Sequence, residues 1–366
     1  MSTTIWFAGG GTGGHLYPGL AIARALVKLD TDVQPFFIGA SRGIEKTVLP
    51  RTEFPHLLLD LHPLYRTRPW DNWRTVRGAV RAWGALGRLA LQNRPRLVVG
   101  TGGYAAGVAQ AYAAAHGLPL VQQAGDSHPG LTARAFRHWT REFYLAYPEA
   151  ARVLGGSTSH FVDTGAPIEP PPVPRPDRAT ARLAWGFPER GGYVLLVYGG
   201  SQGSRAINLV IAEWVRRGLP AGLHLIWMTG TASFDEFRSL DGGAVRVREY
   251  LSPIADAYAA ADLAVVRAGA MTTAELFAWQ IPPIVIPLPS AAADHQSVNA
   301  RTLAAAGAAI NLPQSEFSVH RLEGEINRLI DDPAAMTALR AGASARARPD
   351  AAERIARRIL ALLELA

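Results

Sequence analysis

Short apolar runs alternate with amphipathic stretches along both halves of the chain. In the first half, apolar runs typical of strands lie at 4–8, 33–38, 97–100, 119–122, 142–146 and 160–163. Helical periodicity lies at 18–29, 43–49, 72–92, 105–116 and 130–138. Such alternation predicts a parallel sheet with helices on both faces, and hence an α/β domain over 1–166.

The second half repeats this alternation. Expected strands lie at 193–198, 223–228, 244–247, 263–266, 283–286 and 308–311. Expected helices lie at 204–217, 233–239, 254–260, 271–279, 294–306, 319–331 and 333–342. The pattern predicts a second α/β domain over 178–350, and a chain of 366 residues is long enough for two cores.

A proline-rich segment separates the two halves. Six of the eleven residues from Ala166 to Pro176 are prolines, so this stretch must be extended and rather stiff. We therefore place a linker at 167–177. The last segment, 351–366, is amphipathic, and its length suggests that it packs back on the first domain.

Three glycine-rich turns each follow an apolar run and precede a helical stretch. They are Gly9–Gly14, which is followed by His15, Gly100–Gly103 and Gly199–Gly203. Such turns bring backbone N–H groups close to an anion at the positive end of a helix. Three of them would suit two substrates that each carry a pyrophosphate, bound in a cleft shared by both domains. The alternative is a set of tight turns without a ligand.

The first turn does not match either common nucleotide-binding motif. No acidic residue ends the strand after it, as a dinucleotide site requires, and no Gly-Lys-Ser/Thr follows, as a P-loop requires. Two polar clusters in the second half are more informative. Glu275 follows a strand and a glycine turn, where a carboxylate can accept hydrogen bonds from vicinal ribose hydroxyls or interact with the helix dipole. A second cluster, typical of sugar recognition, consists of Asp294, His295, Gln296 and Asn299.

Composition narrows the possible partners and location. The chain has no cysteine, which excludes disulfides and thiolate metal sites. Its net charge of +7 favours anionic partners, or else reflects an arginine bias only. No nucleic-acid-binding motif is found, so nucleic acid is not expected as a partner. No signal-peptide pattern or apolar run of membrane-spanning length is found, which favours the cytoplasm.

Together these residues resemble the MurG family, the undecaprenyl-pyrophosphoryl-muramoylpentapeptide N-acetylglucosaminyltransferases of peptidoglycan synthesis. The matching segments occur in family order over nearly the whole chain. They are GGGTGGHLYPGLAIARAL (9–26), GTGGYAAGV (100–108), PGLTAR (129–134), GGSQGSRAIN (199–208), RAGAMTTAEL (267–276) and PLPSAAADHQSVNA (287–300).

The resemblance implies a GT-B fold, in which two Rossmann-like α/β domains with parallel sheets face a central cleft. It implies an inverting transfer of N-acetylglucosamine from UDP-GlcNAc to the C4 hydroxyl of undecaprenyl-pyrophosphoryl-MurNAc-pentapeptide, which converts lipid I to lipid II. No metal and no cofactor are expected.

The resemblance also implies the site residues. Thr12, Gly13 and Gly14 would lie near the donor and acceptor phosphates, His15 and Tyr104 would face the acceptor, and Asp126 would also contact substrate. The donor would be bound by Ser201, Gln202, Gly203, Leu251, Ala270, Met271, Thr272, Thr273, Glu275, His295, Gln296 and Asn299. The reaction needs a base for the acceptor hydroxyl. A histidine suits that role best because its pKa lies near neutrality. We therefore expect His15 to act as the base, with Asp126 as the competing candidate. His15 could instead stabilise the loop or contact a sugar.

Two segments depart from the family pattern. The family usually has His-Glu-Gln-Asn where this chain has Gln123-Ala124-Gly125-Asp126, and an arginine where it has Glu169. These changes concern substrate contacts. They keep open two alternatives: a MurG-like enzyme with another lipid or small-molecule acceptor, and a non-catalytic protein that binds UDP-sugar or polyprenyl lipid.

Segment 64–94 combines tryptophans with arginines. It contains Trp70, Trp73, Trp83, Arg66, Arg68, Arg74, Arg77, Arg81 and Arg88. A basic amphipathic helix with tryptophans is typical of membrane interfaces, although an ordinary surface helix is the alternative. We therefore expect peripheral binding to the anionic inner surface, on the cytoplasmic face of the plasma membrane. Cell-wall synthesis proteins are possible partners there.

Overall fold

The computed structural model describes residues 3–63, 70, 72–155, 160–200 and 202–365. The chain divides into two compact units, each described here by itself. Unit 1 comprises Met1–Glu169 and Pro349–Ala366, and unit 2 comprises Pro170–Arg348. The chain thus leaves unit 1 within the proline-rich segment and returns to it for its last helix.

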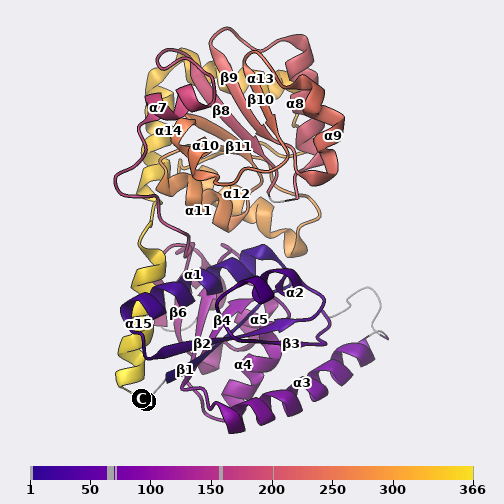
Figure 1. The fold of residues 1–366 in the computed structure, drawn as a ribbon, viewed down its shortest axis with the longest axis vertical. Helices are drawn as coiled ribbons and strands as arrows, with labels where there is room; N and C mark the ends of the chain where they lie inside the picture. The colour runs from indigo at the N-terminus through magenta and orange to yellow at the C-terminus, as the bar shows by residue number, and fades with distance from the viewer. Residues whose placement is uncertain (1–2, 64–69, 71, 156–159, 201, 366) are drawn as a thin grey trace. The chain divides into compact units, whose positions relative to one another are not determined.

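Unit 1 is a parallel seven-stranded sheet in the order β3-β2-β1-β4-β5-β6-β7 (Figure 1). Its strands are β1 (Thr3–Gly9), β2 (Val33–Ala40), β3 (His56–Leu59), β4 (Leu97–Gly102), β5 (Leu120–Ala124), β6 (Thr140–Leu145) and β7 (Phe161–Asp163). Its helices are α1 (Gly13–Leu29), α2 (Glu45–Val48), α3 (Asn72–Gln92), α4 (Ala106–Ala115), α5 (Leu131–Ala135), α6 (Ala150–Leu154) and α15 (Ala351–Glu364).

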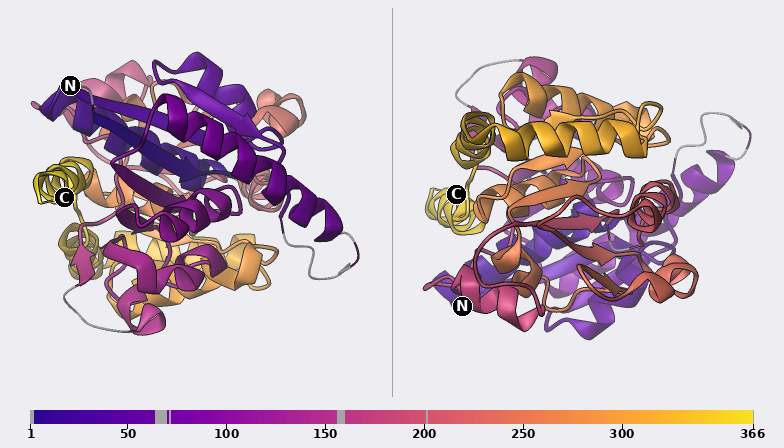
Figure 2. Two further views of the ribbon diagram at one scale, coloured as in Figure 1. Left: turned by 90° about the horizontal axis from the view of Figure 1, so that it is seen from below. Right: turned by 90° about the horizontal axis from the view of Figure 1, so that it is seen from above.

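Helices cover both faces of this sheet (Figure 2). Successive side chains of a strand point to opposite faces, so Phe7 packs with α1 and α15 while Trp6 packs with α3 and α4. The last helix, α15, lies along α1 and buries Ile355 and Ile359. Arg358 adds an ion pair with Glu142, with its Nη2 2.6 Å from Oε1. The amphipathic pattern at the end of the sequence is therefore used inside unit 1.

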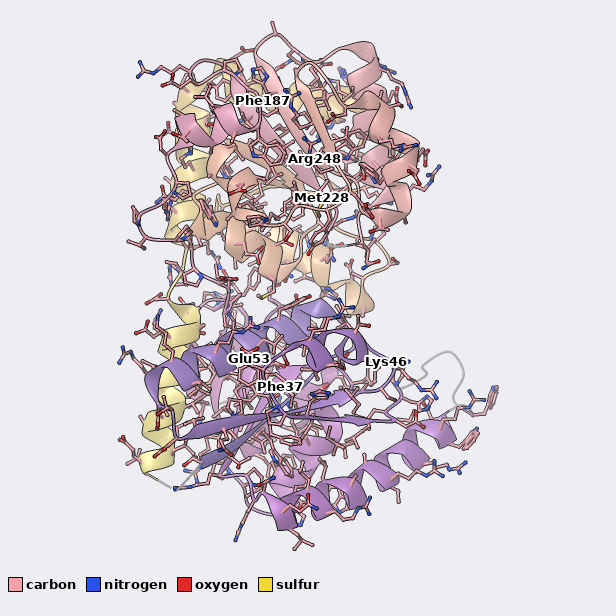
Figure 3. The ribbon with its side chains drawn as sticks, in the orientation of Figure 1. Phe37, Lys46, Glu53, Phe187, Met228 and Arg248 are labelled. Atoms are coloured by element: carbon pink, nitrogen blue, oxygen red, sulfur yellow. The ribbon has the colours of Figure 1, made fainter. Side chains whose placement is uncertain are left out.

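Unit 2 is a parallel six-stranded sheet in the order β10-β9-β8-β11-β12-β13. Its strands are β8 (Tyr193–Tyr198), β9 (Leu223–Met228), β10 (Val245–Arg248), β11 (Leu263–Val266), β12 (Pro283–Val285) and β13 (Ile310–Asn311). Its helices are α7 (Arg178–Ala184), α8 (Arg205–Arg217), α9 (Phe234–Phe237), α10 (Ala255–Ala260), α11 (Ala270–Ala278), α12 (His295–Ala305), α13 (Val319–Asp331) and α14 (Pro333–Ala345). Met228 and Arg248 mark the ends of β9 and β10 (Figure 3).

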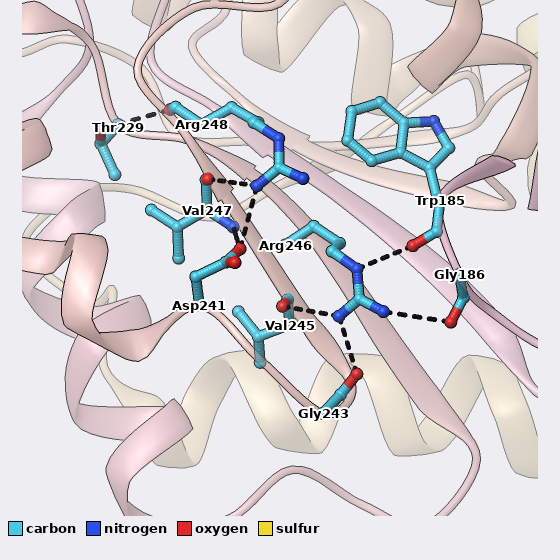
Figure 4. Close-up of polar contacts among 9 residues, drawn as sticks. All are labelled: Trp185, Gly186, Thr229, Asp241, Gly243, Val245, Arg246, Val247 and Arg248. Atoms are coloured by element: carbon cyan, nitrogen blue, oxygen red, sulfur yellow. Dashed lines mark hydrogen bonds and ion pairs between the residues drawn. The ribbon is translucent and has the colours of Figure 1, made fainter.

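Two arginines of β10 secure the edge of this sheet (Figure 4). Arg246 donates hydrogen bonds to the carbonyls of Trp185, Gly186 and Gly243 at 2.7, 3.0 and 2.8 Å. It thereby fixes the turn that follows α7. Arg248 donates to Asp241 Oδ1 at 3.0 Å. Both arginines satisfy backbone or side-chain acceptors nearby, which gives them a structural role.

The structure corrects several sequence expectations about elements. The first helix begins at Gly13, not at residue 18, because the Thr12 carbonyl accepts hydrogen bonds from the amides of His15 and Leu16. Pro18 therefore lies inside the helix, although proline is common at the first position of a helix. Strand β3 and helices α6 and α7 were not expected. They are short, and β3 exists because it pairs with β2. Among the described residues, no helix is long and apolar enough to cross a bilayer.

Candidate active site

The glycine turns of unit 1 lie together at one edge of the sheet. Strands β1, β4 and β5 are neighbours, so the loops that follow them share the carboxyl edge, where open α/β sheets bind ligands. Gly10 donates its amide hydrogen to the Gly102 carbonyl at 3.2 Å. Gly103 has a φ of +77°, and a Cβ there would lie 2.0 Å from the Gly10 carbonyl oxygen. Only glycine allows the two turns to approach this closely.

This edge brings together His15, Thr12 and Tyr104. His15 is in the first turn of α1 and half-buried, and its ring packs against Gly102 and Gly103. Its Nδ1 lies 3.2 Å from the hydroxyl of the exposed Thr12. A Cβ on Gly11 would lie 2.8 Å from the Tyr104 ring. Three of the predicted acceptor residues thus lie around one pair of glycine turns.

The polar segment that departs from the family pattern follows β5 at the same edge. Gln123 and Ala124 are buried at the strand end, and Asp126 is half-buried two residues beyond it. Thr132 donates its hydroxyl hydrogen to the Gly103 carbonyl at 3.0 Å, which ties α5 to the glycine turn. Glu169 is exposed and interacts electrostatically with Arg24, also in unit 1.

Glu45 supports the first glycine turn and was missed from the sequence. Its side chain is fully buried, and Oε1 accepts hydrogen bonds from the amides of Gly11 at 2.9 Å and Ala40 at 3.1 Å. Cβ atoms on Gly10 and Gly43 would lie 1.8 and 2.0 Å from its carboxyl oxygens. The carboxyl group therefore fills a space that these glycines leave. The sequence gives no clear signal for this role, because Glu45 lies among other polar residues such as Arg42 and Lys46.

The turn after β8 forms the corresponding edge of unit 2. Gly203 has a φ of +74°, and a Cβ there would lie 2.0 Å from the Thr229 carbonyl oxygen. Ser204 caps α8 by accepting a hydrogen bond from the amide of Ile207 at 3.5 Å. Gln202 is exposed. Ser201, which was predicted to bind the donor pyrophosphate, lies outside the described residues.

Arg267 connects the strand ends of unit 2 and was not singled out as a site residue. Its Nη2 donates to Ser204 Oγ and Gln314 Oε1, both at 2.7 Å, and its Nη1 donates to the carbonyls of Ile286 and Pro287. The side chain is 8% exposed, and burial lowers its pKa from the ordinary arginine value. No carboxylate pairs with it among the described residues. A buried positive charge therefore lies directly behind the glycine turn at 199–203.

The helix after Arg267 carries most of the predicted nucleotide contacts. Ala270, Met271, Thr272 and Glu275 are half-buried on α11. Thr273 is buried, and its hydroxyl donates to the Gly269 carbonyl at 3.2 Å. Tyr258 donates its hydroxyl hydrogen to Glu275 Oε2 at 2.8 Å. Leu251 is 6% exposed, so a ligand could be contacted by its backbone groups but not by its buried side chain.

The polar cluster at the start of α12 holds the loops around it. Gln296 Oε1 accepts from the amide of Leu288 at 3.0 Å, and His295 Nδ1 lies 2.8 Å from the Ala292 carbonyl oxygen. Asn299 is fully buried and donates to the Ala268 carbonyl at 3.3 Å. Asn299 therefore supports the turn before α11 from inside the unit. His295 and Gln296 are half-buried.

The two parallel-sheet units, with glycine turns at the carboxyl edges of their sheets, define an α/β protein of the GT-B fold. The chain is similar in structure to MurG of Acinetobacter baumannii, with a TM-score of 0.76 over 98% of this chain and 99% of that chain at 24% identity. It is also similar to the calicheamicin glycosyltransferase CalG4, with a TM-score of 0.72 over 100% and 99% of the two chains at 15% identity.

Sequence comparison identifies the family. Residues 5–144 match the glycosyltransferase family 28 N-terminal domain, and residues 194–355 match its C-terminal domain. Two relatives are named UDP-N-acetylglucosamine–N-acetylmuramyl-(pentapeptide) pyrophosphoryl-undecaprenol N-acetylglucosamine transferase. The protein from Salinibacter ruber is 38% identical over 98% of this chain and 97% of its own, and that from Desulforudis audaxviator is 35% identical over 96% of each. The chain belongs to the MurG family of glycosyltransferases.

Proposed function

We propose that this protein transfers N-acetylglucosamine from UDP-GlcNAc to the C4 hydroxyl of undecaprenyl-pyrophosphoryl-MurNAc-pentapeptide, which converts lipid I to lipid II. The observation that carries this conclusion is the 38% identity to a transferase of that name over 98% of the chain. The expected glycine turns and their supporting residues are present at the sheet edges of both units.

We propose that unit 2 binds the donor. The backbone amides of the turn at 199–204 would face the diphosphate, with Ser201, Gln202 and Gly203 as contacts. The dipole of α8 and the buried charge of Arg267 favour an anion there. The same groups would stabilise the charge on departing UDP without a metal. Uracil would lie beside the backbone of Leu251, the ribose at Glu275, and the transferred sugar near His295 and Gln296.

We propose that unit 1 binds the acceptor and supplies the base. If Nδ1 of His15 carries a proton that Thr12 Oγ1 accepts, Nε2 is the unprotonated nitrogen. Nε2 then takes the proton of the C4 hydroxyl as that oxygen attacks the anomeric carbon. The bond from that carbon to UDP breaks, and its electron pair leaves on the phosphate oxygen. Asp126 is the competing base, and Thr12, Gly13, Gly14 and Tyr104 would contact the acceptor.

We propose that α3 binds the anionic cytoplasmic face of the plasma membrane. One face of this helix packs on the sheet through Ala82 and Leu86, yet the opposite face is also apolar. The exposed stripe consists of Trp73, Val76, Val80 and Trp83, with exposed fractions of 56, 63, 68 and 38%. Arg74, Arg77, Arg81 and Arg88 are exposed on the same helix. Arg66 and Arg68 lie outside the described residues.

The binding to membranes is tested by sedimentation with anionic vesicles. We expect binding that weakens as salt is raised, because the arginines contribute through charge. Val80→Glu should abolish most of it, whereas Leu209→Glu, at an exposed apolar site in unit 2, serves as the matched control. Equal recovery of the wild-type protein in the supernatant with and without vesicles would refute this proposal.

The reaction is tested by radiolabelled transfer with purified lipid I and a panel of UDP-sugars. Transfer from UDP-GlcNAc to lipid I is the expected result. The second candidate is a related enzyme with another acceptor, favoured by Ala124 and Asp126 at the acceptor edge of unit 1. It predicts transfer from UDP-GlcNAc to another lipid or to a small molecule, with lipid I inert. Binding of UDP without any turnover would indicate a non-catalytic binding protein.

A further inference from the structure

Three side chains of unit 2 form a buried chain of hydrogen bonds that ends at Glu275. Tyr198 is the last residue of β8, Tyr258 belongs to α10 and Glu275 to α11. The two tyrosine hydroxyls lie 2.9 Å apart, and Tyr258 donates to Glu275 Oε2 at 2.8 Å. The tyrosines are 4% and 3% exposed. The hydrogen bonds thus run from β8, the strand before the glycine turn at 199–203, to Glu275, the residue predicted to bind the ribose.

The number of hydroxyl hydrogens determines which group donates in each of these hydrogen bonds. A carboxylate can only accept, so the single hydroxyl hydrogen of Tyr258 is used on Glu275. The contact between the two tyrosines must then be a donation from Tyr198 to the oxygen of Tyr258. Burial raises the pKa of both phenols well above the usual value, which keeps both hydrogens in place at neutral pH. Each donor in the chain therefore has one defined acceptor.

We propose that Tyr258 is a positioning residue for donor recognition: its hydroxyl holds the Glu275 carboxylate in the orientation that accepts hydrogen bonds from the ribose hydroxyls. This inference rests on the proposed binding of UDP-GlcNAc by unit 2. A carboxylate offers about four acceptor positions, so one bond from Tyr258 leaves capacity for two ribose hydroxyls. Without that bond, the half-buried Glu275 carboxylate would lose one constraint on its orientation.

The surroundings of Tyr258 restrict its own movement. Its ring lies 5.7 Å from that of Trp279 and 6.5 Å from that of Tyr198, measured between centroids. Both partners are buried. The hydroxyl of Tyr258 is therefore fixed relative to β8, and its hydrogen bond to Glu275 restrains the carboxylate in turn. A flexible donor such as lysine would give no comparable constraint.

The test compares UDP with 2′-deoxy-UDP, which lacks one of the two ribose hydroxyls. Affinities are measured by isothermal titration calorimetry for the wild-type chain and for Tyr258→Phe. We expect the wild-type chain to bind UDP about tenfold more tightly than 2′-deoxy-UDP, since one hydrogen bond to a charged group is at stake. Tyr258→Phe should lose most of this preference. Its affinity for 2′-deoxy-UDP, which keeps one ribose hydroxyl, should fall by less than its affinity for UDP.

Two further variants serve as comparisons. Tyr198→Phe removes the donor to Tyr258 and a hydrogen bond with Thr272 but leaves the bond from Tyr258 to Glu275 in place, so it should reduce the preference less than Tyr258→Phe. Tyr193→Phe, on the same strand but outside the chain of bonds, should leave it unchanged. If Tyr258→Phe weakened the binding of UDP and 2′-deoxy-UDP equally, so that the preference for UDP survived, the positioning role would be overturned. The proposed donor site would not be affected by that result. Failure of the wild-type chain to bind UDP would instead overturn the proposed function and this inference with it.

Discussion

Replacing Glu45 by alanine should loosen the first glycine turn and destabilise unit 1. The change removes the acceptor of two backbone amides, those of Gly11 and Ala40. An unsatisfied buried donor costs about 1–3 kcal/mol. Ala40 is fully buried, whereas Gly11 is half-buried and can recover water. We therefore expect unfolding of unit 1 to become easier by about 3 kcal/mol, toward the middle of the combined range.

Differential scanning calorimetry measures this effect. About 3 kcal/mol corresponds to a fall in Tm of about 6–12 °C for a unit of this size. The Tm of Glu45→Gln should fall by less, because the amide oxygen of glutamine can still accept hydrogen bonds from the amides of Gly11 and Ala40. Its NH2 group would replace Oε2, which has no hydrogen-bond partner among the described residues. Lys46→Ala, at the exposed neighbouring position, is the matched control and should change Tm little.

The functional consequence should be confined to the acceptor side. UDP affinity should remain unchanged in Glu45→Ala, because the donor is proposed to bind unit 2, while the transfer rate at a temperature where the variant is folded should fall. A loss of less than about 1 kcal/mol would show that the carboxyl group does not support the turn in the way we argue. Weakened UDP binding would contradict the assignment of the turn to the acceptor.

Three further predictions concern other contacts. Arg267→Met should weaken UDP binding by about tenfold but leave uridine binding unchanged, because the lost charge acts on the diphosphate; equal losses for both ligands in calorimetry would refute this. The contribution of Tyr198 and Tyr258 to the stability of unit 2 should be constant below pH 10 and then fall by about 1.4 kcal/mol per pH unit for each tyrosine, since the unfolded chain releases those protons first. Tyr198→Phe should reduce that slope in denaturant titrations, and an unchanged slope would contradict it. Arg358→Ala should lower the free energy of unfolding of unit 1 by at most about 1 kcal/mol, because the ion pair is partly exposed. Ile355→Ala in the same helix should lower it by about 2–5 kcal/mol. Similar Tm shifts for both variants would argue against hydrophobic docking of α15.

The local pattern of the sequence was sufficient for the alternation of strands and helices and for the glycine turns. The run 193–198 forms a strand that is buried on both faces of a parallel sheet, so it is apolar throughout and contrasts with the amphipathic stretch that follows it. The motifs around Gly10, Gly103 and Gly203 also pointed to the family, because such turns require glycine at those positions. Short elements such as β3 and α7 gave no such pattern, since their stability comes from neighbours distant in sequence.

The supporting residues of the site were decided only by the tertiary structure. Glu45 reaches Gly11 across 34 positions of sequence, and Arg267 reaches Ser204 across 63. Asn299 was expected among the substrate ligands, yet it is fully buried and holds the Ala268 carbonyl. Sequence patterns record which side chains are polar and where turns occur, because those properties are local. Which buried donor meets which acceptor depends on how strands far apart in the chain are brought side by side, and that is set by packing alone.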